Sequence, residues 1–219
     1  IFDPDLKVDL LVNDGDMIKA NTPIISISGK STSILGAERT ALNFLGILSG
    51  VATETRRLVD KISGTNTRVC CTRKTIPGLR ILQKYAVKCG GGFNHRFGLS
   101  DGILIKDNHI KASGGIKNAV KEIKSISGHM QKIEIEADNI NQVIAAIDSG
   151  VDVIMLDNMT LSDIRNALRI INKKVLVEAS GSISVDNIRD IAETGVDIIS
   201  VGWITHSAPS LDVGLDFKD

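Results

Sequence analysis

The chain has 219 residues, of which 42% are hydrophobic and 24% charged, and its formal net charge is zero. This composition is typical of a globular protein, and no apolar run approaches the roughly 20 residues of a membrane helix. A neutral chain with five Phe, one Tyr and one Trp lacks the basic surface and stacking aromatics of a nucleic-acid binder. The three cysteines, Cys70, Cys71 and Cys89, have neither a disulfide-framework nor a metal-ligand spacing. We therefore expect core thiols in a cytoplasmic protein that binds no nucleic acid and no membrane.

The first 35 residues predict a small β unit, because apolar and polar residues alternate and turn sequences fall at 13–16 and 21–23. From residue 36 to residue 62, apolar side chains recur at helical spacing. Glycines interrupt this run, so the pattern fits either two helices or one bent helix. Arg39 falls in the first turn of the run.

The rest of the chain alternates between short apolar strands and amphipathic helices. The expected strands are residues 67–73, 102–106, 133–138, 151–157, 175–180 and 196–202. A helix is expected over residues 77–90, with Pro77 in its first turn, and helices also follow the third, fourth and fifth strands. Such alternation predicts βα units with a parallel sheet, most simply a (β/α) barrel.

In such a barrel the active site lies at the carboxyl ends of the strands. The residues at these ends are polar, charged or glycine: Arg73, Lys74, Lys106, Glu136, Asp157, Ser180, Gly181 and Gly202. The stretch from Thr72 to Lys111 holds eight Lys or Arg residues and two Asp residues. Several fixed cations favour a small polyanion as ligand, because phosphates and carboxylates need several donors at once. The strand residues Glu134 and Glu178 receive no role from this pattern.

Several of these residues fit more than one interpretation. Lys106 ends a strand, where a lysine serves as a phosphate ligand or as a Schiff-base amine. Glu136 and Asp157 end adjacent strands, where they suit helix caps as well as metal or hydroxyl ligands. The glycines before His95 and Arg96 let the backbone approach a ligand closely, although they also suit a plain loop. The serine and glycines that end the last two strands resemble a phosphate cup built from backbone N–H groups.

Seven segments, in chain order, resemble one family. They are ERTALNFLGILSGVAT (38–53), CTRKTIPGLR (71–80), KYAVKCGGGFNHRFGL (84–99), LIKDNHI (104–110), MLDNM (155–159), EASG (178–181) and VGWITHSAP (201–209). Together they resemble the quinolinate phosphoribosyltransferases, also called nicotinate-nucleotide pyrophosphorylases (carboxylating). The likeness extends over essentially the whole chain.

The resemblance implies an α/β fold, namely a (β/α) barrel of the type II phosphoribosyltransferase kind with an N-terminal α/β sandwich domain that is incomplete here. It implies a partial sandwich domain over residues 1–50, a catalytic barrel over 51–205, and a tail, 206–219, packed on the sandwich domain. The implied reaction joins quinolinate and 5-phosphoribosyl 1-pyrophosphate with Mg²⁺. It yields nicotinate mononucleotide, CO₂ and pyrophosphate in NAD biosynthesis.

The resemblance also implies a role for each matched residue. The implied ligands of the two quinolinate carboxylates are Arg73, His95 and Arg96, with Thr72 and Lys74 adjacent. The implied phosphate ligands are Lys74, Lys106, Ser180, Gly181, Gly202 and His206. The implied ligands of Mg²⁺ and of the ribose hydroxyls are Glu136 and Asp157. Catalysis would fall to Lys74, Lys106, Glu136 and Asp157, which stabilise the leaving pyrophosphate and the cationic ribose. Arg39 would enter the neighbouring subunit's site, so the active unit would be a homodimer.

Four positions depart from the family pattern. Cys71 stands where Asp is usual before the TRKT motif, and Ile76 replaces a usual Thr. Ser182 replaces the second Gly of an ASGG motif, and Trp203 replaces a small residue. None of these changes removes an implied ligand, so they bear on rate and affinity rather than on reaction type.

Other functions stay open from the sequence. They include a lyase or aldolase that uses Lys106 as a Schiff base, the related protein associated with molybdate transport, and a transferase for another pyridine carboxylate. A non-catalytic member of the same family is a further alternative. The segment VNDGDMIKANTPIISI also resembles β modules that carry biotin or lipoate, but it lacks their lysine on a tight turn.

Overall fold

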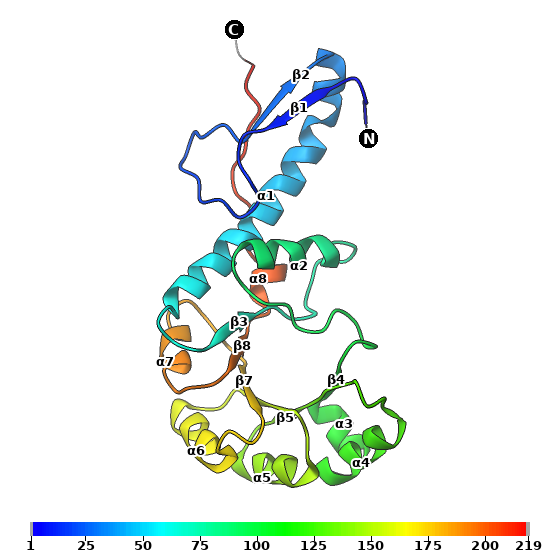
Figure 1. The fold of residues 1–219 in the computed structure, drawn as a ribbon, viewed down its shortest axis with the longest axis vertical. Helices are drawn as coiled ribbons and strands as arrows, with labels where there is room; N and C mark the ends of the chain where they lie inside the picture. Colours follow the sequence, from blue (N-terminus) through cyan, green and yellow to red (C-terminus); the bar gives the residue numbers. More distant parts are fainter. Residues whose placement is uncertain (1, 218–219) are drawn as a thin grey trace.

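The computed structural model describes residues 2–217. Its N-terminal part is a two-stranded antiparallel sheet of β1 (Lys7–Leu10) and β2 (Ile25–Ser28), followed by the 31-residue helix α1 (Ser31–Lys61). Figure 1 shows these two strands beside the N-terminal half of α1, which extends away from the barrel. No helix within residues 2–217 combines the length and the apolar character needed to span a membrane.

The six expected strands are all present and form one parallel sheet. They are β3 (Arg68–Cys70), β4 (Ile103–Ile105), β5 (Ile133–Ala137), β6 (Val153–Asp157), β7 (Leu176–Ser180) and β8 (Ile198–Ser200). The helices are α2 (Arg80–Cys89), α3 (Asp107–Ala112), α4 (Ile116–Ile126), α5 (Ile140–Ser149), α6 (Leu161–Ile171), α7 (Ile188–Ala192) and α8 (Trp203–His206). The strand order is β3-β8-β7-β6-β5-β4, and Figure 1 shows the sheet curving with α3 to α6 on its outside. The predicted (β/α) barrel architecture is therefore confirmed.

The edge strands β3 and β4 do not pair with each other in the described part of the barrel, and the chain between them forms α2 and then a loop over residues 90–102. Phe93 first forms an isolated parallel bridge with Cys70, in which Phe93 N donates to Val69 O at 2.8 Å. The chain then crosses toward β4, where Arg96 Nη1 donates to Gly102 O at 2.9 Å. Arg96 thus lies in the segment that occupies the opening between the edge strands.

Strand residues alternate between the helix side and the interior of the barrel. On the helix side Ile135 and Ile199 are 0% exposed, and burying such a side chain contributes about 1.5–3 kcal/mol. Glu134 and Glu136 stand two residues apart on β5, so they share the opposite, interior face. In the strand register, Glu136 of β5 is paired with Met155 of β6, and Met155 is paired with Glu178 of β7. The interior face therefore carries several carboxylates.

Two helix starts differ from the sequence prediction. α2 begins at Arg80 rather than near Pro77, because Pro77 and Gly78 form a turn in which Gly78 has φ +80°. α1 begins at Ser31, so Arg39 lies in its third turn rather than its first.

α1 is one continuous helix, and its glycines serve close packing rather than termination. A Cβ on Gly46 would lie 2.6 Å from Ser210 Oγ and 2.8 Å from Leu211 O, and a Cβ on Gly50 would overlap Pro209 O. Leu211 N also donates to Gly46 O at 3.0 Å. The C-terminal segment consequently runs along α1, as Figure 1 shows.

Candidate active site

The carboxyl ends of the strands bring most of the expected ligands to one rim of the barrel, which we call the barrel mouth. The residues at these ends are Thr72, Arg73 and Lys74 after β3, Lys106 after β4, Glu136 in β5, Asp157 in β6, Ser180 and Gly181 at the end of β7, and Gly202 after β8. Because all six strands are parallel, these ends lie on the same side of the sheet.

Two guanidinium groups approach each other at the barrel mouth. Burial, and then the positive charge of Arg73, hold the pKa of Arg96 below its usual value. Arg73 Nε is buried and has no hydrogen-bond partner among the described residues, whereas nearly all buried donors have one. Arg80 fixes the surrounding loops, because it donates to Arg73 O at 3.3 Å and to Phe97 O at 3.1 Å. Two close cations with an unused donor are suited to bind a planar carboxylate.

Lys106 forms an ion pair with Glu136 at the barrel mouth. Glu136 is 8% exposed and also accepts a hydrogen bond from Asp107 N at 3.3 Å. His109 Nδ1 accepts from Lys106 N at 2.9 Å and so fixes the main chain of Lys106 at the start of α3. The sequence IKDNH thus explains how a cation and a carboxylate are held side by side.

Gly202 keeps a space open among three polar side chains. A Cβ on Gly202 would lie 2.9 Å from Lys74 Cδ, 3.5 Å from Thr72 Oγ1 and 3.7 Å from His206 Nε2. Thr205 Oγ1 donates to Lys74 O at 2.7 Å, which holds the β3 loop against α8. A cation, a hydroxyl and an imidazole therefore surround this glycine, and such groups are suited to bind a phosphate.

The loops after β6 and β7 interlock next to this site. Asn158 (φ 51°), Gly181 (φ 93°) and Ser182 (φ 51°) all have positive φ. Asn158 Nδ2 donates to Asp157 Oδ2 at 3.0 Å, and Ser182 Oγ donates to Asn158 Oδ1 at 3.3 Å. An open pocket of about 360 Å³ lies along these loops. Gly181 is required here because a Cβ would overlap the Asn158 amide.

Glu136 and Asp157 do not cap the helices that follow them. Asn139 caps α5 and Thr160 caps α6, each through a side-chain oxygen. The carboxylate of Asp157 is half-buried and accepts from the neighbouring Asn158 amide. The helix-cap interpretation of these two acids is therefore wrong.

Glu134 and Glu178, which the sequence left without a role, converge on His95 inside the barrel. His95 Nε2 lies 2.9 Å from Glu134 Oε2 and 3.8 Å from Glu178 Oε2. On the other side of the ring, Nδ1 accepts a hydrogen bond from Arg96 N at 2.8 Å. Lys84 Nζ donates to His95 O at 2.8 Å. The period of two along a strand was the available signal, because it places Glu134 on the same face as Glu136.

The electrostatics of this cluster follow from its burial. Glu134 is 7% and Glu178 is 2% exposed. Burial, and then the negative charge of Glu134, raise the pKa of Glu178. Burial opposes a charge on His95, but the hydrogen bond to Glu134 and the charge of Glu178 raise its pKa overall. Among residues 2–217, these three side chains form the one group of His, Cys, Asp and Glu residues whose spacing suits a metal ion.

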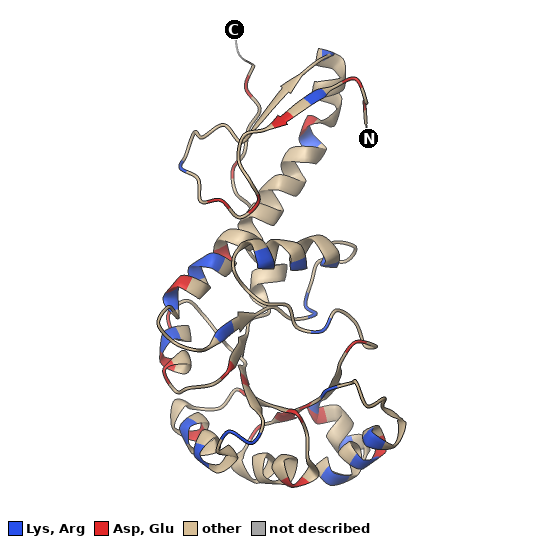
Figure 2. Ribbon diagram, viewed as in Figure 1, with Lys and Arg blue, Asp and Glu red and all other residues tan. Residues whose placement is uncertain are grey.

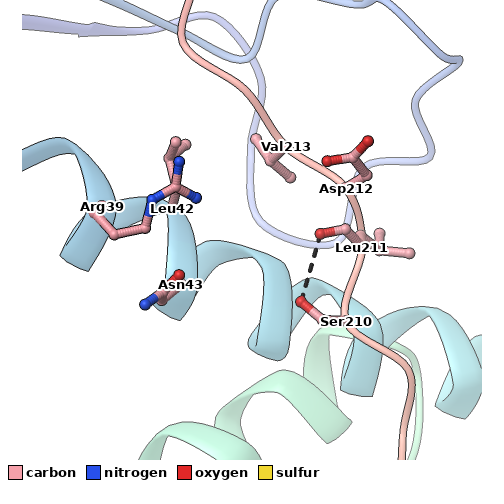
Figure 3. A pocket seen from close by; sticks show the side chains of 7 residues that line it. All are labelled: Arg39, Leu42, Asn43, Ser210, Leu211, Asp212 and Val213. Carbon is pink, nitrogen blue, oxygen red and sulfur yellow. Dashed lines mark hydrogen bonds between the residues drawn. The ribbon is translucent and has the colours of Figure 1, made fainter.

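Arg39 lies outside the barrel mouth of its own chain. Its side chain is 75% exposed. It lines an open pocket of about 330 Å³ together with Asn43 and residues 210–213, and no residue of the barrel mouth lines this pocket. Figure 3 shows Arg39 on the side of α1 along which the C-terminal segment passes.

The cations between residues 72 and 111 occupy several different environments. Those at or near the barrel mouth are Arg73, Lys74, Arg96 and Lys106. Lys84 is buried and donates to Cys71 Sγ at 3.1 Å. Lys88 and Lys111 are exposed on helices, and Lys111 pairs with Asp107 at 3.3 Å. Figure 2 likewise shows Lys and Arg on the outer helices. The local charge excess therefore overstates the charge of the site itself.

The fold is a (β/α) barrel, and its mouth gathers cations that are suited to small anions with carboxylates or phosphates. The family model described as quinolinate phosphoribosyl transferase, C-terminal domain, matches residues 51–216. The model of the N-terminal domain matches residues 1–49. The chain belongs to the quinolinate phosphoribosyltransferase family.

Individual relatives agree with this assignment. The chain is 43% identical over 216 residues to the probable nicotinate-nucleotide pyrophosphorylase [carboxylating] of Bacillus subtilis, and the match covers 99% of this chain and 75% of the relative. It is 44% identical to the nicotinate-nucleotide pyrophosphorylase of Ehrlichia chaffeensis, whose crystal structure superposes with a TM-score of 0.93 over 96% of this chain and 77% of that one. NadC from Streptococcus pyogenes is 39% identical with a TM-score of 0.93, over 100% of this chain and 78% of that one. The chain is thus shorter than these relatives.

Proposed function

We propose that the chain is a decarboxylating quinolinate phosphoribosyltransferase of NAD biosynthesis. It transfers phosphoribosyl from 5-phosphoribosyl 1-pyrophosphate to the ring nitrogen of quinolinate. The bond from C1′ to pyrophosphate breaks and a bond from C1′ to nitrogen forms. The carboxylate beside that nitrogen then leaves as CO₂, and a proton takes its place on the ring carbon, which gives nicotinate mononucleotide. The family membership supports this reaction, as do relatives more than 40% identical over nearly the whole chain.

The observation that carries the proposal is the arginine pair of the barrel mouth. Arg73 lies close enough to Arg96 for its charge to lower the pKa of Arg96, and Arg73 Nε is a buried donor without an acceptor among the described residues. A bound carboxylate would satisfy this donor and relieve the repulsion between the two cations. Two arginines suit a dicarboxylate, since each guanidinium can bind one carboxylate bidentately.

The phosphates of the ribose donor bind along the rest of the mouth in this proposal. Lys106 and Lys74 contact the pyrophosphate, where their positive charges stabilise the leaving anion. The 5′-phosphate takes the backbone N–H groups of the last two strand ends, Ser180, Gly181 and Gly202, with Thr72 and His206 beside them. The negative charge of Glu136 favours the cationic ribose that develops as the anomeric bond breaks.

The donor set also fits Mg²⁺, which the reaction requires in this proposal. Asp157 and Glu136 are hard oxygen donors, and Mg²⁺ commonly takes one or two carboxylates together with substrate phosphates. We assign Asp157, and Glu136 beside it, as the residues that would hold the ion. When bound, Mg²⁺ would neutralise charge on the leaving pyrophosphate.

The exposed position of Arg39 is the basis for a homodimer in this proposal. Each subunit's Arg39 enters the barrel mouth of the other subunit and adds a third guanidinium for the substrate. In this proposal the sandwich domain covers the described residues 2–50, the catalytic barrel covers 51–205, and the described part of the tail, 206–217, packs on the sandwich domain. The contact of residues 209–211 with Gly46 and Gly50 supports this division. Three free cysteines suit a reducing compartment such as the cytoplasm.

A Schiff-base mechanism for Lys106 finds no support in its surroundings. The nucleophile of such a reaction is the neutral amine, whereas Lys106 forms an ion pair with Glu136. Borohydride trapping of a substrate adduct on Lys106 would revive this alternative.

Turnover of the purified protein tests the proposal directly. With quinolinate, 5-phosphoribosyl 1-pyrophosphate and Mg²⁺, we expect nicotinate mononucleotide and CO₂, and a folded Lys106→Ala variant should lose the activity. Nicotinate, which has a single carboxylate, is the matched comparison substrate. We expect kcat/KM to favour quinolinate by at least about 100-fold, because nicotinate leaves one guanidinium without a partner. A folded protein that makes no product, or that uses nicotinate equally well, would refute the proposal.

A further inference from the structure

The carboxylate of Asp157 depends on a single side chain for its orientation. Asn158 Nδ2 donates to Asp157 Oδ2 at 3.0 Å, and within residues 2–217 this carboxylate has no other hydrogen bond or ion pair. Glu136, by contrast, is paired with Lys106 and also accepts from Asp107 N at 3.3 Å. The two acids of the barrel mouth are therefore held in different ways, and Asp157 is held by its neighbour in the chain.

Asn158 is in turn held by the loop that follows β7. Its backbone N–H donates to Ser180 O at 2.9 Å, and its side-chain Oδ1 accepts from Ser182 Oγ at 3.3 Å. Its amide also occupies the space that a side chain at position 181 would fill, because a Cβ on Gly181 would overlap it. The Asn158 amide thus bridges two loops, with its nitrogen on Asp157 and its oxygen on Ser182.

The backbone of this bridge is adapted to the contact. Asn158 and Ser182 both have φ 51°, in the left-handed region that residues with a Cβ seldom adopt. Asn tolerates this conformation better than most residues. Conformations of this kind persist where the surrounding contacts hold them, and they are concentrated at ligand sites.

We propose that Asn158 is a positioning residue, which fixes the Asp157 carboxylate and joins it to the loop after β7. This inference rests on the proposed function, which assigns Asp157 to the Mg²⁺ of the ribose donor and assigns Ser180 and Gly181 to its 5′-phosphate. Asn158 does not touch the substrate in this account. It acts through Asp157, by holding the carboxylate at a constant place relative to the phosphate ligands.

The loop after β7 has two further supports that do not involve Asn158. Asn187 Nδ2 donates to Ser182 O at 2.9 Å, and Trp203 Nε1 donates to Ile183 O at 2.9 Å. Ser182 and Trp203 are two of the four positions that depart from the family pattern, and here both hold this loop. Loss of the Asn158 amide should therefore free the Asp157 carboxylate while the phosphate ligands stay in place.

The first test observes the bridge without reference to activity. In ¹⁵N-labelled protein, the side-chain amide of Asn158 is identified by its loss in an Asn158→Gly spectrum. We expect one of its Nδ2 protons to be shifted downfield, as for a hydrogen-bonded amide, and this shift should disappear in Asp157→Ala. Ser182→Gly, which keeps the backbone conformation and removes the hydroxyl, should move the same resonance by a smaller amount. A resonance that is unchanged in Asp157→Ala would overturn the proposal.

The second test measures binding of single ligands by calorimetry. Glycine accommodates the positive φ at position 158, so Asn158→Gly removes the amide without straining the backbone. We expect the Kd for 5-phosphoribosyl 1-pyrophosphate with excess Mg²⁺ to rise about fivefold, which corresponds to one ordinary hydrogen bond at an exposed residue. The Kd values for quinolinate and for inorganic phosphate should each change less than about twofold, since their ligands are held by other contacts. Asn172→Gly is the matched control, because Asn172 has φ 47° at the end of α6, before β7, and it should change none of these values.

A double-mutant cycle then shows whether Asn158 acts through Asp157. In an Asp157→Ala background, Asn158→Gly should raise the Kd for 5-phosphoribosyl 1-pyrophosphate less than about twofold, because the carboxylate that it positions is gone. A fivefold loss that persists in this background, or equal losses for all three ligands, would overturn the positioning role and leave the proposed reaction standing.

The opposite combination is equally informative. The expected resonance shifts and donor Kd values, in a protein that binds the ribose donor but forms no product from quinolinate, would support the role of Asn158 and overturn the proposed function. A folded wild-type protein that does not bind 5-phosphoribosyl 1-pyrophosphate with Mg²⁺ would overturn both.

Discussion

Replacement of Arg73 by glutamine should separate binding from stability. Arg73 Nε is buried without an acceptor, and the charge of Arg73 adds to the burial that lowers the pKa of Arg96. In the absence of ligand, Arg73 therefore contributes an unsatisfied donor and a like-charge contact, both of which destabilise the fold. Arg73→Gln removes both of these costs but also removes a bidentate ligand of the carboxylate.

The magnitudes follow from these contacts. Two charge-assisted hydrogen bonds to a carboxylate contribute about 3 kcal/mol, so the Kd for quinolinate should rise about 150-fold. At a quinolinate concentration of 100 times the wild-type Kd, ligand adds about 2.7 kcal/mol to the free energy of unfolding of the wild type, but about 0.3 kcal/mol to that of Arg73→Gln. Without ligand, the free energy of unfolding of Arg73→Gln should equal or exceed that of the wild type by up to about 1 kcal/mol.

Denaturant unfolding with and without quinolinate measures all of these quantities in one experiment. Arg68→Gln is the matched control, because Arg68 is on β3, the strand that precedes Arg73, and its guanidinium lies 4.7 Å from the centroid of the Phe93 ring. We expect this control to lose about 0.5–1 kcal/mol of stability, through the lost cation–π contact, and to keep its quinolinate affinity. An Arg73→Gln protein that is less stable than wild type without ligand and still binds quinolinate would refute the reasoning.

Three further predictions concern other parts of the molecule. Arg39→Ala and Lys106→Ala proteins should each be inactive and should regain about a quarter of wild-type activity per site when mixed, if Arg39 acts across a dimer; proven subunit exchange without recovery would exclude this. Burial and then the charge of Glu134 raise the pKa of Glu178 from 4.5 to about 8, so between these pH values the folded protein holds a proton that the unfolded chain releases. The free energy of unfolding of the wild type should therefore fall relative to that of Glu178→Gln as pH rises from 5 to 8, by up to about 1.4 kcal/mol per pH unit, and pH-independent denaturation differences would contradict it. Gly181→Ala should lose about 2 kcal/mol more than Gly195→Ala, because both have φ above +90° but only at Gly181 would the Cβ overlap a neighbouring side chain; equal losses in thermal melts would show that overlap does not matter.

The barrel was predictable because its strands are short apolar runs separated by helices of regular length. The predicted helix boundaries were less accurate where a residue type is compatible with more than one local conformation. Pro77 suits the first turn of a helix, but here it forms a turn with Gly78 before α2. Gly46 and Gly50 suggested a break in a helix, whereas the structure uses them to bring residues 209–211 against α1. That partner is far away in the sequence, so local rules could not identify it.

The candidate site was predictable to the extent that parallel strands align their carboxyl ends. Lys106, Glu136 and Asp157 each follow or end a strand, so their common rim follows from topology alone. The neighbours of His95 were not predictable in the same way. The contact of Glu134 with His95 joins residues 39 apart in the chain, and the contact forms only because the loop after Phe93 turns into the barrel.

The opening between β3 and β4 explains how two consecutive residues reach different parts of the barrel. His95 contacts Glu134 in the barrel interior, whereas Arg96 lies near Arg73 at the barrel mouth. In a regular strand, His95 and Arg96 would point to opposite faces, and one of them would be directed at the surrounding helices. In the loop, both side chains turn inward, so His95 reaches Glu134 and Arg96 approaches Arg73. Strand pairing that closed the barrel here would stabilise the backbone but would separate the guanidinium from its support. The incomplete closure of the sheet is therefore part of the proposed anion site, and the hydrogen bonds of Lys84 and His95 hold the loop where strand pairing is missing.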